Sequence, residues 1–280
     1  MKTDEKGLVM KLRFLFGAAV VAAFLSVTGI ASAAPSGTAL TCTGGLWTGD
    51  PSTSIFTIIP SGNYSSITVA GVCAVAPDAL VNVTGNINVA PGALFNAQSA
   101  PSTITVGQNV TAGAGSLLGL GCFPDGAHSG HTCAIEPDGS SAIKVNGNVS
   151  ATNAALVLLN GITVGKNVSI SGGGPGGDWA EKQNTIGGNF SVSGVTPDWM
   201  GLEFNKVGGN MNLSNIWAID PGDGGYGAVN VVVNNIGHNL NCSGLGPRLS
   251  GGIFPGEVNI VGHVTTGQCV NLPSGPPPGP

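Results

Sequence analysis

The chain has 280 residues, of which only 8% are charged and 5% aromatic, while 47 are glycine. Nine basic and fourteen acidic residues give a formal net charge of −5 at pH 7. Because nucleic acids and anionic membranes attract basic patches, this balance argues against both as partners. With so few charges, Gly, Asn, Ser and Thr must supply the polar surface, which is typical of regular β-structure with tight turns.

Residues 1–33 have the pattern of a secretory signal peptide. Lys11 and Arg13 precede an apolar stretch from Phe14 to about Ile30, and Ala31-Ser32-Ala33 matches a small-residue cleavage site. A retained membrane anchor is the alternative. No later stretch is long and apolar enough to cross a bilayer, so we expect a mature chain without a transmembrane helix, secreted or held at the cell surface.

Residues 34–73 differ in character from the repetitive remainder of the chain and are expected to form an N-terminal cap. This segment contains Thr41-Cys42-Thr43-Gly44 and strand-like runs at 55–59 and 66–69. An open parallel stack exposes a strand edge and an apolar end, so its terminal unit must be atypical. We expect a disulfide between Cys42 and Cys73 to join the cap to the first coil.

A short repeat organises the rest of the chain. Each copy has an apolar residue, Gly-x-Asn and then alternating apolar and polar residues, as in Val164-Gly165-Lys166-Asn167-Val168-Ser169-Ile170. The period of two predicts a strand with one buried face, and Gly and Asn are favoured in tight turns. The marker asparagines are Asn86, Asn109, Asn148, Asn167, Asn189, Asn210 and Asn239, and His263 takes the marker place in a last, degenerate copy.

Most markers lie 19 to 29 residues apart, a spacing typical of stacked repeats that cannot bury their apolar faces alone. The leucine spacing of leucine-rich repeats is absent. We therefore expect an all-β, single-domain, right-handed parallel β-helix of about nine coils over residues 74–272, with the marker amides stacked in a ladder. The gap of 39 between Asn109 and Asn148 is either two coils or one coil with an inserted loop.

Four longer insertions interrupt the coils, and a Pro-rich tail at 273–280 follows them. In solenoids such insertions collect on particular faces and often form the binding surface. The insertions are expected at 122–133, 172–178, 220–226 and 245–256.

An even number of cysteines behind an export signal favours disulfides. Because coils touch only adjacent coils, we expect nearest-neighbour pairing, with Cys122 joined to Cys133 and Cys242 to Cys269 in addition to the cap disulfide. A zinc site made of Cys122, His128, His131 and Cys133 is the alternative, since these residue types bind zinc. Its spacing is not standard and the expected compartment is oxidising, so we expect no metal and no other cofactor.

A polysaccharide hydrolase or lyase on this fold would need paired carboxylates, either as acid and base or as Ca²⁺ ligands. The chain offers three such pairs: Glu136 with Asp138, Asp178 with Glu181, and Asp220 with Asp223. Each pair lies beside Gly or Pro in an expected turn, where Asp is favoured for its local hydrogen bonds. We therefore expect no catalysis, and Asp220 with Asp223 is the pair that best fits the alternative of an enzyme.

Trp179, Trp199 and Trp217 are spaced 20 and 18 residues apart, close to one per coil. With Tyr226 they are the candidate binding residues, because exposed aromatic rings in register would offer a platform for sugar rings. Counted from the preceding marker they fall 12, 10 and 7 positions on. The alternative, that they cover the edge of the core beneath the insertions, therefore stays open.

The repeat, the Cys42-Thr43-Gly44 opening and the export signal together resemble a group of secreted bacterial β-solenoid proteins, common in actinobacteria, with no assigned activity. The resemblance covers residues 41–269, and its motifs are specific to architecture. The copies are also weakly similar to the bactofilin-type polymer-forming solenoids. The resemblance implies a solenoid scaffold and carries over no catalytic residue.

The sequence thus predicts a secreted or cell-envelope structural or adhesive module, a rigid rod on the order of 45 Å long for nine coils. Its expected partner is a cell-wall or extracellular polysaccharide, or an envelope protein, contacted through the insertion loops. A polysaccharide lyase or glycoside hydrolase is the alternative function, because one architecture hosts many activities.

Overall fold

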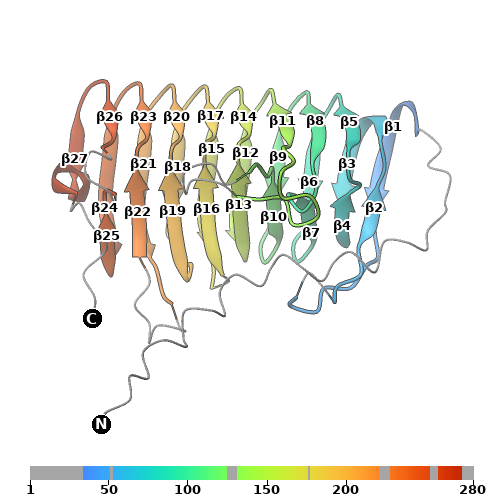
Figure 1. The fold of residues 1–280 in the computed structure, drawn as a ribbon, viewed down its shortest axis with the longest axis horizontal. Helices are drawn as coiled ribbons and strands as arrows, with labels where there is room; N and C mark the ends of the chain where they lie inside the picture. The colour runs from blue at the N-terminus through green and yellow to red at the C-terminus, as the bar shows by residue number, and fades with distance from the viewer. Residues whose placement is uncertain are drawn as a thin grey trace, which may run out of the picture.

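The computed structural model describes residues 34–50, 53–124, 131–175, 177–220, 228–252 and 258–272. These residues form one stack of parallel strands, a β-solenoid of about nine turns whose axis runs horizontally in Figure 1. The expected all-β parallel β-helix is therefore confirmed. The expected signal peptide and the Pro-rich tail lie outside the described residues.

Each coil contributes three strands, which stack on their counterparts in neighbouring coils as three rows. Row 1, directly before the marker turn, contains β5 (Ala79–Val83), β8 (Ser102–Val106), β11 (Ala142–Val145), β14 (Thr163–Val164), β17 (Thr185–Ile186), β20 (Lys206–Val207), β23 (Asn235–Ile236) and β26 (Ile260–Val261). Row 2, directly after the turn, contains β6 (Ile87–Val89), β9 (Val110–Ala112), β12 (Val149–Ala154), β15 (Val168–Gly173), β18 (Phe190–Ser193), β21 (Met211–Trp217), β24 (Leu240–Gly246) and β27 (Thr265–Gly267). Row 3, which leads to the next coil, contains β2 (Thr57–Ile59), β4 (Val72–Val75), β7 (Leu94–Ala97), β10 (Leu117–Leu120), β13 (Leu156–Asn160), β16 (Asp178–Lys182), β19 (Trp199–Glu203), β22 (Ala228–Val232) and β25 (Arg248–Ser250).

The strands form because their residues alternate between the core and the outside. In β5, for example, Ala79, Val81 and Val83 are buried while Leu80 and Asn82 are exposed. Since the strands are in parallel register, inward side chains of equivalent strands stack directly on one another along the axis. Each fully buried aliphatic or aromatic side chain contributes roughly 1.5–3 kcal/mol, so the columns supply most of the stability.

The marker asparagines form the expected ladder at the turn between rows 1 and 2. The backbone N–H of each marker donates to Oδ1 of the marker in the preceding coil at 2.8–3.1 Å, from Asn109 through to Asn239. The last rung is made by Val264, whose N–H donates to Oδ1 of Asn239 at 3.1 Å. Val264, and not His263 as expected, therefore occupies the marker place. The ring of His263 stacks on that of His238, the residue before a marker, with centroids 5.0 Å apart.

A second asparagine ladder, which the sequence analysis did not anticipate, lies buried at the corner between rows 3 and 1. Its rungs are Asn184, Asn205, Asn234 and Asn259. Each of the first three donates its backbone N–H and its Nδ2 to Oδ1 of the next rung at 2.9–3.1 Å. The same Nδ2 groups also donate to row 3 carbonyls, as from Asn205 to Glu181 at 2.8 Å.

These corners need the ladder because their backbone is left-handed. The residues before the first three rungs, Gln183, Phe204 and Val233, have φ of 54°, 57° and 52°. A non-glycine residue in this region costs on the order of 1–3 kcal/mol, and a β-branched one such as Val233 rarely adopts it. The buried amides satisfy the backbone groups that such a tight corner would otherwise leave unpaired.

The insertions lie at the two edges of row 3. Because Val110 of β9 pairs directly with Val149 of β12, the marker gap of 39 is one coil with an inserted loop, at 121–141. That loop and residues 251–259 connect row 3 to row 1, whereas 174–177 and 218–227 connect row 2 to row 3. Rows 1 and 2 are joined only by short marker turns, so row 3 is the face that the insertions frame.

The N-terminal segment joins the stack instead of forming a separate unit. β1 (Ala34–Cys42) pairs in parallel with β3 (Gly62–Val69), and β3 continues through both row 1 and row 2. β2 pairs in parallel with β4. The parallel pairing therefore begins before residue 74, and the disulfide between Cys42 and Cys73 ties this first coil together as expected.

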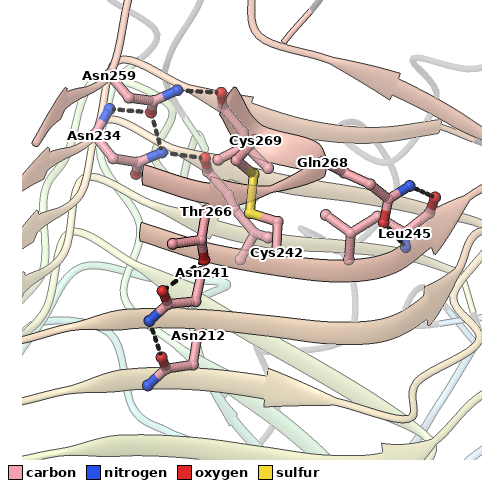
Figure 2. The surroundings of a disulfide bond; sticks show 11 residues. Asn212, Asn234, Asn241, Cys242, Leu245, Asn259, Thr266, Gln268 and Cys269 are labelled. Atoms are coloured by element: carbon pink, nitrogen blue, oxygen red, sulfur yellow. Dashed lines mark hydrogen bonds between the residues drawn. A yellow bond between two sulfur atoms is a disulfide. The ribbon is translucent and has the colours of Figure 1, made fainter. Parts of the chain in front are cut away.

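The C-terminal coil is closed by its own polar groups (Figure 2). Gln268, at the start of a 3₁₀ turn (Gln268–Asn271), accepts a hydrogen bond from the Leu245 N–H at 2.7 Å and donates one to its carbonyl at 2.8 Å, so its amide replaces a further strand. The Cys242–Cys269 disulfide fastens the same turn to β24, and buried Cys269 covers the end of the core. With Cys122–Cys133, all three disulfides follow the nearest-neighbour pairing.

No described segment is a helix long and apolar enough to cross a membrane.

Replacing Asn205 with Ala should destabilise the chain far more than replacing Asn210, the marker in the same coil. Asn205→Ala leaves buried donors of Asn184 and the Glu181 carbonyl unpaired, which should lower the free energy of unfolding by about 3 kcal/mol or more. Water can replace the partially exposed amide of Asn210, so Asn210→Ala should cost about 1 kcal/mol. Chemical denaturation of both variants measures the difference, and equal losses would contradict a special role for the buried ladder.

Candidate functional site

The aromatic and charged side chains of the described coils gather on row 3 and at its edge toward row 2. Trp179, one of the predicted binding residues, is an exception. It faces inward between Val157 and Met200 and has no exposed surface. The prediction that Trp179 binds a ligand is therefore wrong, because its ring is a core side chain and cannot reach one.

Trp199 and Trp217 do lie on the outside, each against a glycine. The Trp199 ring lies next to Gly201 of its own strand, and the Trp217 ring next to Gly246 of the next coil, where a Cβ on either glycine would collide with the indole. Trp217 is 52% exposed and Trp199 is half-buried. The glycines make room for the two rings on the sheet, and the exposed part of each ring offers aromatic surface to a sugar.

Carboxylates lie beside these rings. Asp178 pairs in register with Trp199, and the N–H of Asp198 donates to the Gly177 carbonyl at 3.0 Å. Burial and the negative charge of Asp220 raise the pKa of the Asp198 carboxyl above its usual value, while a separate hydrogen bond from the Gly177 backbone to that carboxyl lowers it. We call Asp178, Asp198, Trp199, Trp217 and Asp220 the aromatic edge. Asp198 is a member that the sequence analysis had not singled out.

Several of the remaining predicted site residues lie outside the described part of the chain. Asp223 and Tyr226 lie outside the described residues, as do Asp125 and His128. The zinc alternative is wrong, because Cys122 and Cys133 form a disulfide and are not available as thiolate ligands. In the part of the chain that the structure describes, no three His, Cys, Asp or Glu side chains are grouped to hold a metal ion.

Glu181, predicted as a possible partner of Asp178, points to the opposite side of the sheet. It lies in an inward column between Leu159 and Leu202, is 0% exposed, and neither carboxylate oxygen has a hydrogen-bond partner. Burial raises the pKa of Glu181 well above its usual value. The two residues cannot act together as acid and base, because the sheet separates their side chains.

A polar cluster that the sequence analysis missed lies on the outer face of row 3. Nζ of Lys182 is 3.2 Å from Oε2 of Glu203 and 5.3 Å from the centre of the Trp199 ring. Nδ2 of Asn230 donates to Oε1 of Glu203 at 3.4 Å. Burial and the positive charge of Lys182 lower the pKa of His131, in the 121–141 loop, to about 4. His131 is therefore uncharged at neutral pH.

The spacing of these residues from the next marker did indicate which of their side chains face inward. Counted backward from the next marker, Glu181 lies eight residues before Asn189, as Leu202 does before Asn210 and Val231 before Asn239. Trp179 lies ten residues before its marker, on the inward parity, whereas Trp199 lies eleven before and faces outward. Backward counting works because these insertions enter before row 3, so that the distance from row 3 to the next marker stays fixed.

Replacing Glu181 with Leu should stabilise the chain, and more so as the pH rises. Because the folded pKa is raised, the folded chain keeps a proton that the unfolded chain releases, so stability falls as the pH rises through the ordinary Glu range. Glu181→Leu continues the leucine column and removes an unpaired buried carboxyl, a gain of about 1–3 kcal/mol even in acid. Urea denaturation of Glu181→Leu and of Glu181→Gln, the non-ionising control, should show that both lose the wild-type pH dependence. A wild-type profile preserved in both variants would contradict this assignment.

The fold and these side chains are the basis on which a function can be argued, since no protein-family model, curated protein or solved structure matches this chain.

Proposed function

We propose that this chain is an exported structural and adhesive rod that binds an extracellular or cell-wall polysaccharide at the aromatic edge. The observation that carries the proposal is the pair of surface tryptophan rings, each packed against a glycine and lying beside carboxylates at an edge of row 3. Aromatic faces supply stacking area, and neighbouring carboxylates accept hydrogen bonds from sugar hydroxyls.

The rod itself supports this role. The marker ladder runs along the coils from Asn86 to Val264, the buried ladder adds rungs from Asn184 to Asn259, and disulfides lie in the first and last coils. Gln268 and Cys269 close one end of the core, which favours a rod of fixed length over end-to-end growth. Disulfides are typical of exported proteins, in agreement with the predicted secretion.

A carbohydrate-active enzyme is the second candidate function. It is favoured by the raised pKa of Asp198 beside the charge of Asp220, because a carboxylic acid that keeps its proton can act as a general acid. A hydrolase also needs a second carboxylate at a set distance across the scissile bond. The rod remains the first candidate because Glu181, the buried carboxyl with the most strongly raised pKa, lies in the core and out of reach of any substrate.

Replacing Trp217 with Ala should weaken polysaccharide binding by about tenfold, since stacked aromatic residues are frequent binding hot spots. The test applies the oxidised protein to a glycan array and measures affinity for the retained glycans with wild type and variant. Leu80→Ala, at an exposed apolar position of row 1 away from the edge, is the control and should leave affinity unchanged.

The same glycans should be assayed for reducing ends and unsaturated products. Binding without turnover supports the adhesive rod. Turnover that Asp198→Asn abolishes would replace it with the enzyme. Equal binding by the wild type and Trp217→Ala would remove the aromatic edge as the binding site.

A further inference from the structure

Three consecutive strands of row 3 end in an amide, an amine and a carboxylate at one register position. Asn160 of β13 pairs with Lys182 of β16, and Lys182 pairs with Glu203 of β19. These residues come directly after the inward column of Leu159, Glu181 and Leu202, so their side chains face outward from the sheet. Adjacent strands are about 4.8 Å apart, which places the three side chains next to one another.

Asn160 is the unexplained member of this group. It is 1% exposed, yet neither Oδ1 nor Nδ2 has a hydrogen-bond partner. A buried amide without partners costs free energy, and native proteins rarely keep one without a reason. The equivalent position in the preceding coil is Gly121, which has no side chain, so the neighbour of Asn160 along the row is Lys182.

Lys182 and Glu203 form a shielded pair. Their side chains are 15% and 11% exposed, and the Trp199 ring lies 5.3 Å from Nζ. Nζ of Lys182 lies 3.2 Å from Oε2 of Glu203, so this carboxylate is the base placed next to the amine.

We propose that Lys182 and Asn160 join through an isopeptide bond that cross-links β16 to β13, with Glu203 as the catalytic residue. Glu203 first takes one proton from Nζ, which it contacts at 3.2 Å. The amine Nζ then attacks Cγ of Asn160, which forms the Nζ–Cγ bond. The Cγ–Nδ2 bond breaks, and the second proton that Nζ loses passes directly to Nδ2, which leaves as ammonia. The amide and the amine give a new amide and ammonia, so no oxidant, reductant or further reactant is needed.

The geometry requires one movement. Nζ is held at Glu203, on the far side of Lys182 from Asn160, and a change of rotamer in the long lysine side chain brings it back across the strand spacing. Fixed neighbours of this kind gain the large effective concentration of an intramolecular reaction, which compensates for the low reactivity of an amide.

Such a bond would serve the rod at a place that the disulfides do not reach. The disulfides join residues in the first coil, the last coils and the 121–141 loop, whereas β13 and β16 belong to successive coils in the middle of the stack. The cross-link would hold the coil that contains the buried Glu181. This inference is independent of what the aromatic edge binds.

The test is an intact-mass measurement of the purified folded chain, with its ends and disulfides established by peptide mapping. The wild type should be lighter than its sequence mass by one ammonia, and digestion should yield a branched peptide that contains both Asn160 and Lys182. Lys182→Arg, Asn160→Ala and Glu203→Gln should each have the full sequence mass. Lys206→Arg, an exposed lysine in the next coil, should keep the mass deficit.

The Asn160→Asp variant gives a signature that a purely structural role would not produce. By the same chemistry it should lose one water instead of one ammonia. A folded wild type with its full sequence mass and no branched peptide would overturn the proposal. So would a mass deficit that persists in Lys182→Arg, whatever the glycan-binding results are.

Discussion

The structure depends on the hydrogen bonds that asparagine side chains make at its corners. A parallel coil must turn three times, and each turn interrupts the strand ladder that pairs the backbone. At the marker turn and at the buried corner, an amide oxygen of one coil accepts the backbone N–H of the neighbouring coil. The two ladders run in opposite directions, since marker N–H groups donate backward along the axis and buried-corner N–H groups donate forward. From Asn184 to Asn259 both ladders tie the coils to their neighbours, which lets left-handed corners such as Val233 persist.

The need to keep these amides in register determines which corners of a coil can accept insertions, and so which face can carry functional side chains. The marker turn and the buried corner have little freedom in length, because their amides must stay in register. Insertions occur at the corner between rows 2 and 3 and at two row 3 to row 1 corners. The first of these, at 121–141, has no Asn–Asn rung, and the second, at 251–259, has a rung on one side only, from Asn234 to Asn259. Polar and aromatic side chains on row 3 therefore lie between corners that accept insertions, whereas many outward positions of rows 1 and 2 carry small residues such as Thr163 and Ser169. The face with variable borders is the one that carries Trp199, Lys182 and Glu203.

The fold was predictable from the sequence because the marker repeat indicates three things together: the length of a coil, the position of a strand and the position of a turn. The disulfides were predictable as well, since adjacent coils leave few choices. The site was harder for a physical reason. Forward from a marker, an insertion separates Asn167 from Trp179 but none separates Asn210 from Trp217, so forward counting could not show which rings face the core. The buried ladder was hidden because Asn184 and Asn205 read as ordinary turn residues without the register that places them inside. Asp223 and Tyr226 lie outside the described residues.

On row 3, the alternation of inward and outward side chains along a strand places neighbouring residues in different environments. Glu181 and Lys182 are neighbours in sequence, yet the first enters an apolar column and the second faces a carboxylate on the outside. An unpaired carboxyl in the core weakens the coil in which it lies, and replacing it with Leu would cost the fold nothing in geometry, because Leu159 and Leu202 occupy the same column. The opposite side of the same strand is where a covalent link to β13 would act. The unpaired carboxyl of the core and the proposed cross-link therefore lie on opposite faces of β16, so a bond between coils would act where burial of Glu181 costs stability.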